Sequence, residues 1–475
     1  MRLLDIFKKK FLVVPIWLWG VLAVVSIAFY SIYCYSDVIW TTRNGLTLWY
    51  MIFERIPIGR FYVTPYPLAE GDWHAYYDFF IYIIFAIWDF PLFIYEKLAG
   101  TSFADNYIAL WYAKSISMFF YFLSAYQVYK MALKISGDRE RAGWGVFSYI
   151  FSPMMMPVIV IMGGYDVISL FFTLCGVNAY LDEKNKKFVI YFACAIACKM
   201  FALLVFILLI LLRWKKIWKL MLLLLSGISF ILIPKVYFIL YQKISNADTL
   251  IEGIDDTISS VMYIDAYLWS GEAPFALTAI PLFFFFTFIL AVMCYFCKKQ
   301  LDDKMIVYIS FLGMVIFVLT SDTHPQWIVL VTPYIAVLEC LIWKNLSKKA
   351  FLDVCCGVSY FLWKVRQSPQ CFSYNIVNNM LHIEEGDVEF WSTGIWTIIS
   401  KMADVTHIQI DHIWVLIRSV LVASFIMLLF YLMPKQGQDE KFPEKGEKIF
   451  YNKAFASMMV LGIPLLGVAV RFIVG

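Results

Sequence analysis

Charged residues are scarce in this chain of 475 residues: Lys, Arg, Asp and Glu make up 16% of it, against about 25% in a typical soluble protein. The net charge of +4 is too small to indicate a nucleic-acid partner. Hydrophobic residues make up 62% of the chain and aromatic residues 19%. This balance excludes an ordinary soluble domain, and the sequence predicts an all-α polytopic membrane protein.

Several familiar motifs are also absent. There is no Gly-rich pattern of the Rossmann or P-loop type, so we expect no nucleotide site. The ten cysteines lie mostly inside apolar segments, and Cys355 and Cys356 are adjacent, so they cannot form a Cys-x-x-Cys site. We predict neither a disulfide framework nor a cysteine metal site. The first apolar segment lacks a small-residue cleavage site, so we expect no cleaved signal peptide.

Basic clusters orient the predicted spans, because loops rich in Lys and Arg stay in the cytosol. Arg2, Lys8, Lys9 and Lys10 precede the first apolar segment, residues 11–34, which predicts a cytosolic N-terminus. The whole chain, 1–475, is then a single transmembrane domain of about 11–13 segments. Its large extracytoplasmic loops are residues 37–78, 243–274 and 364–412, and its most hydrophilic cytosolic loop is residues 435–453.

Two apolar segments do not fit as simple crossings. Residues 79–98 are interrupted at Asp89 and Pro91, and a proline removes a helix hydrogen bond. Residues 188–212 lie between basic clusters but are far shorter than the roughly 40 residues that two full spans need. We predict a broken, re-entrant helix in the first segment and a hairpin that turns at Lys199 in the second.

Polar residues collect on one predicted face. Asp37, Asp166 and His324 each lie at the outer end of an apolar span. Lys199 and Asp89 interrupt apolar segments that dip towards the same face. Ionisable groups at membrane depth usually mark a functional site, so this arrangement predicts a lined cavity.

Asp37 is the candidate catalytic residue. It is the first ionisable residue after the first span, and a carboxylate at a half-dry interface can act as a general base. The alternative is a structural ion pair with Arg43. Because Asp37 is a lone acid and not part of an Asp-x-Asp pair, the sequence does not support a metal site, although a divalent ion is left open.

The remaining candidates suit a phosphorylated, sugar-bearing substrate. Arg43 and Arg60 can bind phosphate with two hydrogen bonds each. Lys199 offers a point charge to a phosphate that enters from the membrane, or simply snorkels. His324 can donate to a phosphate or a sugar hydroxyl, or form an interfacial polar tip. Asp166 can bind sugar hydroxyls, or be a helix-end acid without such a role.

At these residues the chain resembles the GT-C superfamily of polytopic glycosyltransferases that use polyprenyl-phosphate sugars. It is most similar to the bacterial multi-spanning members and to the mannosyltransferase of GPI-anchor synthesis. Those families place a catalytic acid just after the first span, as Asp37 is here. They often carry Gly-Gln-x-Asp at the outer end of a later span, matched by the run from Gly163 to Asp166 with Gly164 in place of Gln.

Two later features extend this resemblance over residues 11–343. A Lys-Pro break before a Leu-rich run is matched at Lys199, with Met200 in place of Pro. A late motif of polar residues, Pro and an aromatic residue is matched by Thr323-His324-Pro325-Gln326-Trp327.

The resemblance implies an inverting transfer of a sugar from a polyprenyl-phosphate donor to a glycan, lipid or protein acceptor. It implies no cofactor and places the protein in a cell membrane, expected to be a bacterial plasma membrane. Asp37 would be catalytic, and the substrate-binding residues would be Arg43, Arg60, Asp166, Lys199, His324 and Gln326. The alternatives are a polytopic transporter or lipid-linked-glycan flippase, or a glycan polymerase of another superfamily. Against transport, the sequence shows no two matching halves.

Overall fold

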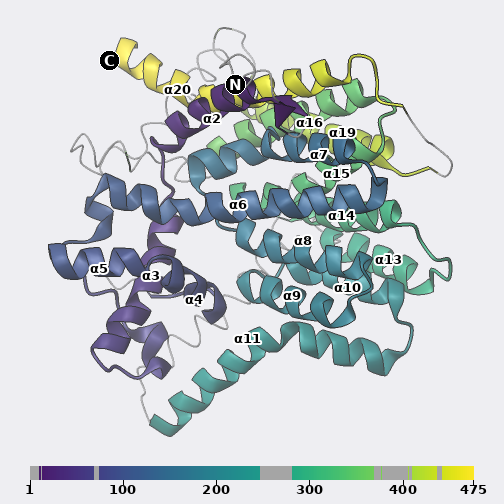
Figure 1. Ribbon diagram of the computed structural model, residues 1–475. Helices are drawn as coiled ribbons and strands as arrows, with labels where there is room; N and C mark the ends of the chain where they lie inside the picture. The colour runs from purple at the N-terminus through teal and green to yellow at the C-terminus, as the bar shows by residue number, and fades with distance from the viewer. Residues whose placement is uncertain are drawn as a thin grey trace, which may run out of the picture.

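The part of the chain that the structure describes is built almost entirely from helices (Figure 1). The structure, a computed structural model, describes residues 10–11, 13–68, 74–245, 281–321, 323–367, 376, 405, 409–435 and 441–474. Within these residues the one sheet is an antiparallel pair of short strands, β1 (Lys10–Phe11) and β2 (Val14–Pro15). The predicted all-α class is confirmed.

The chain forms α-helices and four short helices of other types. The α-helices are α2 (Ile16–Tyr30), α3 (Ser36–Phe53), α4 (Phe79–Trp88), α5 (Phe90–Ala99), α6 (Tyr107–Ser136), α7 (Arg139–Ile150), α8 (Val167–Leu181), α9 (Asn185–Cys198), α10 (Ala202–Arg213), α11 (Ile217–Ser245), α13 (Leu282–Phe296), α14 (Asp303–Thr320), α15 (Thr332–Leu341), α16 (Leu346–Gln367), α19 (Ile410–Leu432) and α20 (Gly446–Val474). Three short 3₁₀-helices are η1 (Ile58–Val63), η2 (Phe103–Asp105) and η4 (Pro325–Leu330), and η3 (Pro157–Met162) is a π-helix.

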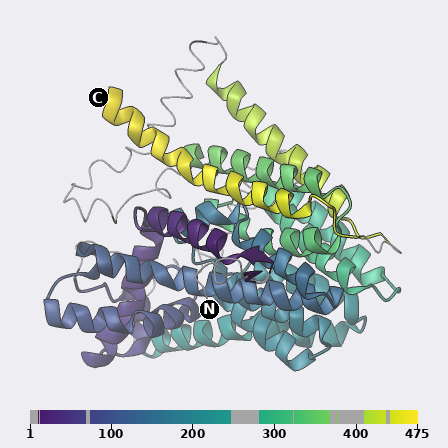
Figure 2. The ribbon, with the colours of Figure 1, turned by 45° about the horizontal axis from the view of Figure 1, so that its top comes forward.

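The helices divide into a bundle and an end group. In Figure 1, α6, α7, α8 and α15 run side by side across the middle of the molecule. Helices α3, α4 and α5 gather at one end of the bundle, on the left of that view. Figure 2 shows α16, α19 and α20 as a further layer against the bundle. Helix α3, which carries Asp37, therefore lies at one end of the bundle.

Local sequence explains how the longest helix of the bundle begins and ends. The Asn106 side chain accepts hydrogen bonds from the backbone N–H groups of Ile108 (2.9 Å) and Ala109 (3.2 Å), and so caps α6. Gly137 ends α6 in the left-handed conformation, with φ of 68°, which a glycine adopts without strain. Asp138 then caps α7. The two helices therefore reverse direction over a very short link.

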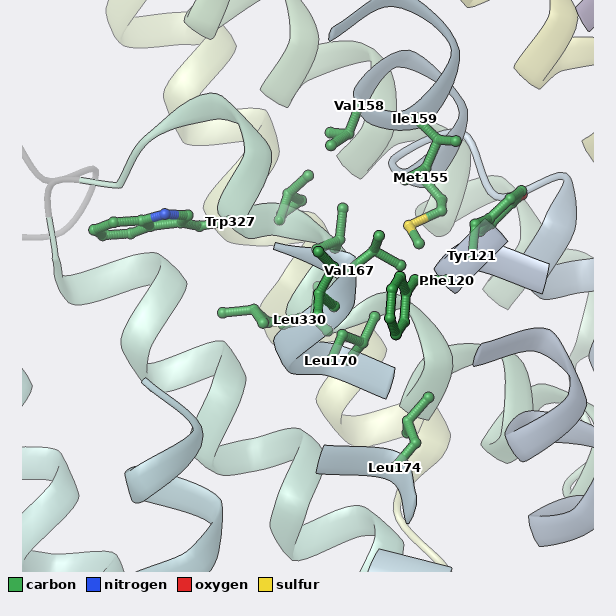
Figure 3. Close-up of a cluster of buried hydrophobic side chains, with 14 of the residues drawn as sticks. Phe120, Tyr121, Met155, Val158, Ile159, Val167, Leu170, Leu174, Trp327 and Leu330 are labelled. Atoms are coloured by element: carbon green, nitrogen blue, oxygen red, sulfur yellow. The ribbon is translucent and has the colours of Figure 1, made fainter. Parts of the chain in front are cut away.

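The core nearest the predicted site surrounds η3. Figure 3 shows buried side chains of the η3 segment facing α6, α8 and η4. The labelled residues are Phe120, Tyr121, Met155, Val158, Ile159, Val167, Leu170, Leu174, Trp327 and Leu330. This packing holds together the elements that carry Asp166 and Gln326.

Apolar helices in the described part of the chain support a multi-pass membrane protein. Four of these helices are long and apolar enough to cross a membrane, or up to five if the bent pair α4–α5 counts as one span. Shorter apolar stretches include α2, α8, α10, α13 and the run from η4 into α15. The length rule therefore recovers fewer spans than the predicted 11–13, because several predicted spans fold as shorter pieces.

Both predicted breaks are present. Helices α4 and α5 meet at Asp89 with a bend of 64°. Helices α9 and α10 are separated at Lys199. The far ends of α9 and α10 meet, since Arg213 at the end of α10 donates to the side chain of Asn185 at the start of α9, at 2.9 Å. Residues 188–212 therefore form the predicted hairpin.

The prediction of loops was less accurate. Residues 37–78 were expected to be a loop, but α3 and η1 occupy much of this segment. The first span, expected over residues 11–34, has a helix only at Ile16–Tyr30. Residues 246–280, 368–375 and 377–404, in and around the other two predicted extracytoplasmic loops, lie outside the described residues. Helix α20 begins inside the predicted cytosolic loop, residues 435–453.

A buried charged cluster attaches α20 to the bundle. Lys453 on α20 donates to Glu339 on α15 at 2.6 Å and pairs with Asp353 on α16. Ser148 on α7 donates to the same Glu339 oxygen at 2.7 Å. All four residues are buried. One lysine thus offsets two carboxylates drawn from two other helices.

Replacing Lys453 with methionine should destabilise the fold by about 3–5 kcal/mol, because two buried carboxylates would lose their counter-charge. The measurement is thermal unfolding of the purified variant in detergent. Lys448→Met on the exposed side of α20 is the matched control and should change little. Neutralising the acids as well, with Glu339→Gln and Asp353→Asn, should restore stability. Failure of that triple variant to recover would contradict this account.

Candidate active site

Asp37 lies in the first turn of α3, where the helix dipole favours a negative charge. Its carboxylate is partly exposed and is held from two directions. The Tyr77 hydroxyl donates to Oδ1 at 3.0 Å, and the Gln326 side-chain amide donates to Oδ2 at 3.2 Å. Each carboxylate oxygen therefore keeps acceptor capacity for a further proton donor.

Gln326 reaches Asp37 from the short helix η4. It is buried, with 3% of its surface exposed. Its own carbonyl oxygen, Oε1, has no hydrogen-bond partner among the residues that the structure describes. Pro325 directly before it fixes the start of η4. The side chain is thus oriented by the fold and points its amide at the candidate base.

Asp166 and Lys199 form the second part of the site. Asp166 ends the turn after η3 and is fully buried, and its Oδ1 lies 3.7 Å from Lys199 Nζ. Lys199 sits in the break between α9 and α10. Its ammonium lies 3.6 Å from the centre of the Tyr77 ring. Tyr77 therefore connects the two parts, because its hydroxyl binds Asp37 and its ring lies under Lys199.

His324 borders this group from the N-terminal end of η4. Tyr360 on α16 donates to its backbone oxygen at 3.0 Å, and Lys364 donates to the backbone oxygen of Thr323. Burial lowers the pKa of His324 to about 4, an effect that nearby Asp37 opposes and Lys199 and Lys364 reinforce. The imidazole is therefore neutral at pH 7 and acts as a hydrogen-bonding group, not as a cation.

The two arginines lie apart from this group. Arg43 is further along α3 than Asp37, about 9 Å at the usual helical rise. Its guanidinium lies over the rings of Trp40 (4.5 Å) and Tyr66 (5.7 Å). Arg60 is exposed on η1. The structure thus brings together Asp37, Asp166, Lys199, His324 and Gln326, whereas the contacts that it shows for Arg43 are with aromatic rings and Arg60 is exposed.

Sequence reasoning missed Tyr77 and Tyr165 as site residues. Tyr77 is one of many aromatic residues between the first span and α4, and only its adjacency to Asp78 at the start of α4 set it apart. The Tyr165 ring packs against that of Tyr77, with centroids 6.1 Å apart. Asp89, also expected to dip towards the site, is buried at the bend between α4 and α5.

The expectation that the site holds no metal ion stays a prediction from the sequence. Within the described residues no three His, Cys, Asp or Glu side chains come close enough together to hold a metal ion. Asp37 and Asp166 are the two carboxylates of the site, and they lie close enough for the charge of Asp37 to raise the pKa of Asp166.

Asp166→Asn should stabilise the protein at pH 7.5. Burial raises the pKa of the Asp166 carboxyl to about 6, against the opposing effect of Lys199. The folded protein therefore holds this proton more tightly than the unfolded chain, and the charged form costs stability above pH 6. The gain should be on the order of 1–3 kcal/mol.

The test compares thermal unfolding of Asp166→Asn and wild type from pH 7.5 down to pH 4. The stability gap should be present above pH 6 and should close as the pH falls towards the ordinary pKa of an aspartate, about 3.9. A gap that stays constant over this range would show that the charge of Asp166 carries no such cost.

The fold is similar to that of a solved glycosyltransferase structure, which agrees with the fold that the sequence resemblance implies. The solved structure of ArnT from Cupriavidus metallidurans bound to undecaprenyl phosphate superposes on this chain with a TM-score of 0.50. The two share 13% sequence identity over 96% of this chain and 77% of that one. No family model and no curated protein sequence matches the chain.

Proposed function

We propose that the protein is an inverting glycosyltransferase that moves a sugar from a polyprenyl-phosphate donor to a hydroxyl of a glycan, lipid or protein acceptor. The observation that carries this proposal is the partly exposed Asp37 carboxylate, oriented on both oxygens, beside the Lys199 cation that stacks on the same tyrosine. A lipid phosphate suits the fold, since ArnT of similar fold is bound to undecaprenyl phosphate.

In this reaction Asp37 takes the proton of the acceptor hydroxyl. The acceptor oxygen then attacks the anomeric carbon from the face opposite the leaving group. The bond between that carbon and the phosphate oxygen breaks, and the polyprenyl phosphate leaves with the electron pair. Attack from the opposite face inverts the anomeric configuration in a single step.

The other site residues stabilise the leaving phosphate and bind the sugar. Lys199 offsets the charge that develops on the leaving phosphate, where a fixed cation acts strongly because little water surrounds it. Neutral His324 and buried Asp166 have acceptors for sugar hydroxyls, and His324 also has a donor. Asp166 at the same time holds the Lys199 ammonium, which lies 3.7 Å from its Oδ1 and over the ring of Tyr77.

The orientation of the protein in the membrane is part of this proposal as well. The basic residues before the first span favour a cytosolic N-terminus, which puts Asp37 on the extracytoplasmic face of a bacterial plasma membrane. A donor whose lipid chain lies in the membrane would then meet Lys199 at the break of the α9–α10 hairpin.

The test is an assay of membranes that contain or lack the protein, supplied with a panel of radiolabelled polyprenyl-phosphate sugars. The expected result is that the labelled sugar moves from the polyprenyl phosphate to an acceptor, and that it does so only in membranes that contain the protein. The transporter alternative predicts that labelled donor crosses sealed vesicles with its sugar-phosphate bond intact. That outcome, without any transferred product, would overturn the proposal.

A further inference from the structure

Lys114 is a buried cation that the proposed chemistry does not use. It lies on α6, and none of its surface is exposed. Its ammonium donates to three backbone oxygens, those of Tyr30 (3.0 Å), Tyr33 (2.6 Å) and Val160 (2.6 Å). The ammonium also lies 4.1 Å from the centre of the Tyr30 ring. All three N–H donors of the lysine are therefore used on the backbone.

The three oxygens belong to places where the backbone needs a donor. Tyr30 is the last residue of α2, and Tyr33 lies in the link from α2 to α3. Val160 lies near the end of the short helix η3. Carbonyls at helix C-termini lack partners within the helix, and the partial negative charge there favours a cation. One ammonium thus provides hydrogen bonds to backbone oxygens of two chain segments that are distant in sequence.

Each segment leads directly to a carboxylate of the site. The chain after Tyr33 enters α3 at Ser36 and carries Asp37 in the first turn. The chain after Val160 passes through the turn that ends at Asp166. The two segments are also joined to each other, because the Tyr35 N–H donates to the Met162 oxygen at 3.3 Å.

The surroundings of Lys114 fit this lysine closely. Ser117, one turn further along α6, donates to the Gly163 oxygen at 2.6 Å. Gly163 has φ of 70°, and a Cβ there would lie 2.6 Å from Lys114 Cγ. Glycine is therefore required both by the backbone conformation and by the lysine stem. Helix α6 fixes the second segment at two points.

From this arrangement we infer that Lys114 is a positioning residue: by holding both chain segments, it sets where Asp37 lies relative to Asp166. The inference rests on the proposed function, since it assigns Lys114 to the same reaction. The alternative is that Lys114 only stabilises the fold. The two accounts differ in what a folded variant without the ammonium does to turnover.

The test compares Lys114→Met, Lys114→Gln and the matched control Lys130→Met, which replaces an exposed lysine on the same helix. Glutamine keeps two N–H donors, and methionine keeps none. Since a misplacement of about 1 Å can cost about 100-fold in rate, we expect kcat to fall about 10–100-fold in Lys114→Met and less in Lys114→Gln. KM for the donor should stay near wild type in both, because Lys199 is unchanged.

A second readout does not depend on activity. Hydrogen exchange, followed by mass spectrometry, should speed up in the segments around Tyr35 and Met162 in Lys114→Met, and not in α19. Folded variants with wild-type kcat would overturn the inference, and so would variants that fail to fold with either substitution, since that assigns Lys114 to the fold alone. If the wild-type protein transfers no sugar, the proposed function fails, whatever the exchange result.

Discussion

An Asp37→Asn protein should fold and bind donor, yet transfer sugar about 10²–10⁴-fold more slowly than wild type. The asparagine keeps the shape of the side chain and removes the group that accepts the proton. The fold should tolerate it, because the Gln326 amide can turn and present its Oε1, which has no partner among the described residues, to the new N–H₂ group. The measurement is the initial rate at saturating donor, with thermal stability alongside.

Two companion variants separate catalysis from folding. Asp37→Glu restores the charge but moves the carboxylate by about one methylene, so it should recover only part of the rate. Arg43→Gln tests the ion-pair alternative: if Asp37 served mainly to pair with Arg43, then the double variant Asp37→Asn with Arg43→Gln would regain activity. The position of Arg43 over Trp40 and Tyr66 leads us to expect no such recovery.

Lys199→Met should weaken use of the donor by about 10–100-fold in kcat/KM. A hydrogen bond to a charged group contributes about 1.5–3 kcal/mol, and this variant removes the cation that we propose faces the donor phosphate. It also leaves Asp166 without its counter-charge, which should lower stability at neutral pH. The measurement is kcat/KM for the polyprenyl-phosphate sugar, compared with that of wild type.

Two controls sharpen this prediction. Lys187→Met removes an exposed lysine from α9, the helix that precedes Lys199, and should change neither stability nor kcat/KM. The double variant Lys199→Met with Asp166→Asn removes the buried unpaired charge and should regain stability without regaining donor use. Recovery of donor use in the folded double variant would show that Lys199 acts only as the partner of Asp166.

The breaks in apolar segments were the most informative part of the sequence. Asp89 and Lys199 each stand in a run of apolar residues where a charge is costly, so a break there follows from simple physics. The structure has a bend at Asp89 and a hairpin turn at Lys199. Of the predicted residues, Asp37, Asp166, Lys199, His324 and Gln326 lie near one another in the structure, whereas Asp89 is buried at the bend between α4 and α5.

Helix α3 could not be predicted by the same reasoning. Its charged residues suggested a solvated loop, whereas the helix buries one face against α4. Gly45 makes this contact close, since a Cβ at that position would lie 2.9 Å from the Cβ of Phe85. Such an approach depends on tertiary packing, which local sequence does not report. The same limit applies to Arg43: the sequence suggests a phosphate ligand, whereas in the structure its guanidinium lies over the rings of Trp40 and Tyr66.

Tyr77 and Lys114 show a second limit. Tyr77 connects Asp37 with Lys199 through contacts that depend on how α4 and α9 come together. Lys114 lies in the apolar first half of α6, but its role depends on two distant backbone segments. Sequence reasoning can mark such a cation as unusual, but only the fold supplies its partners.

The most direct test of the central claim uses purified protein in lipid nanodiscs and a donor labelled in both its sugar and its phosphate. The account predicts that wild type, given an acceptor, transfers the sugar label and releases labelled polyprenyl phosphate in equal amounts, whereas folded Asp37→Asn does so about 10²–10⁴-fold more slowly. A stable Asp37→Asn protein that transfers the sugar label and releases labelled polyprenyl phosphate at nearly the wild-type rate would contradict the account.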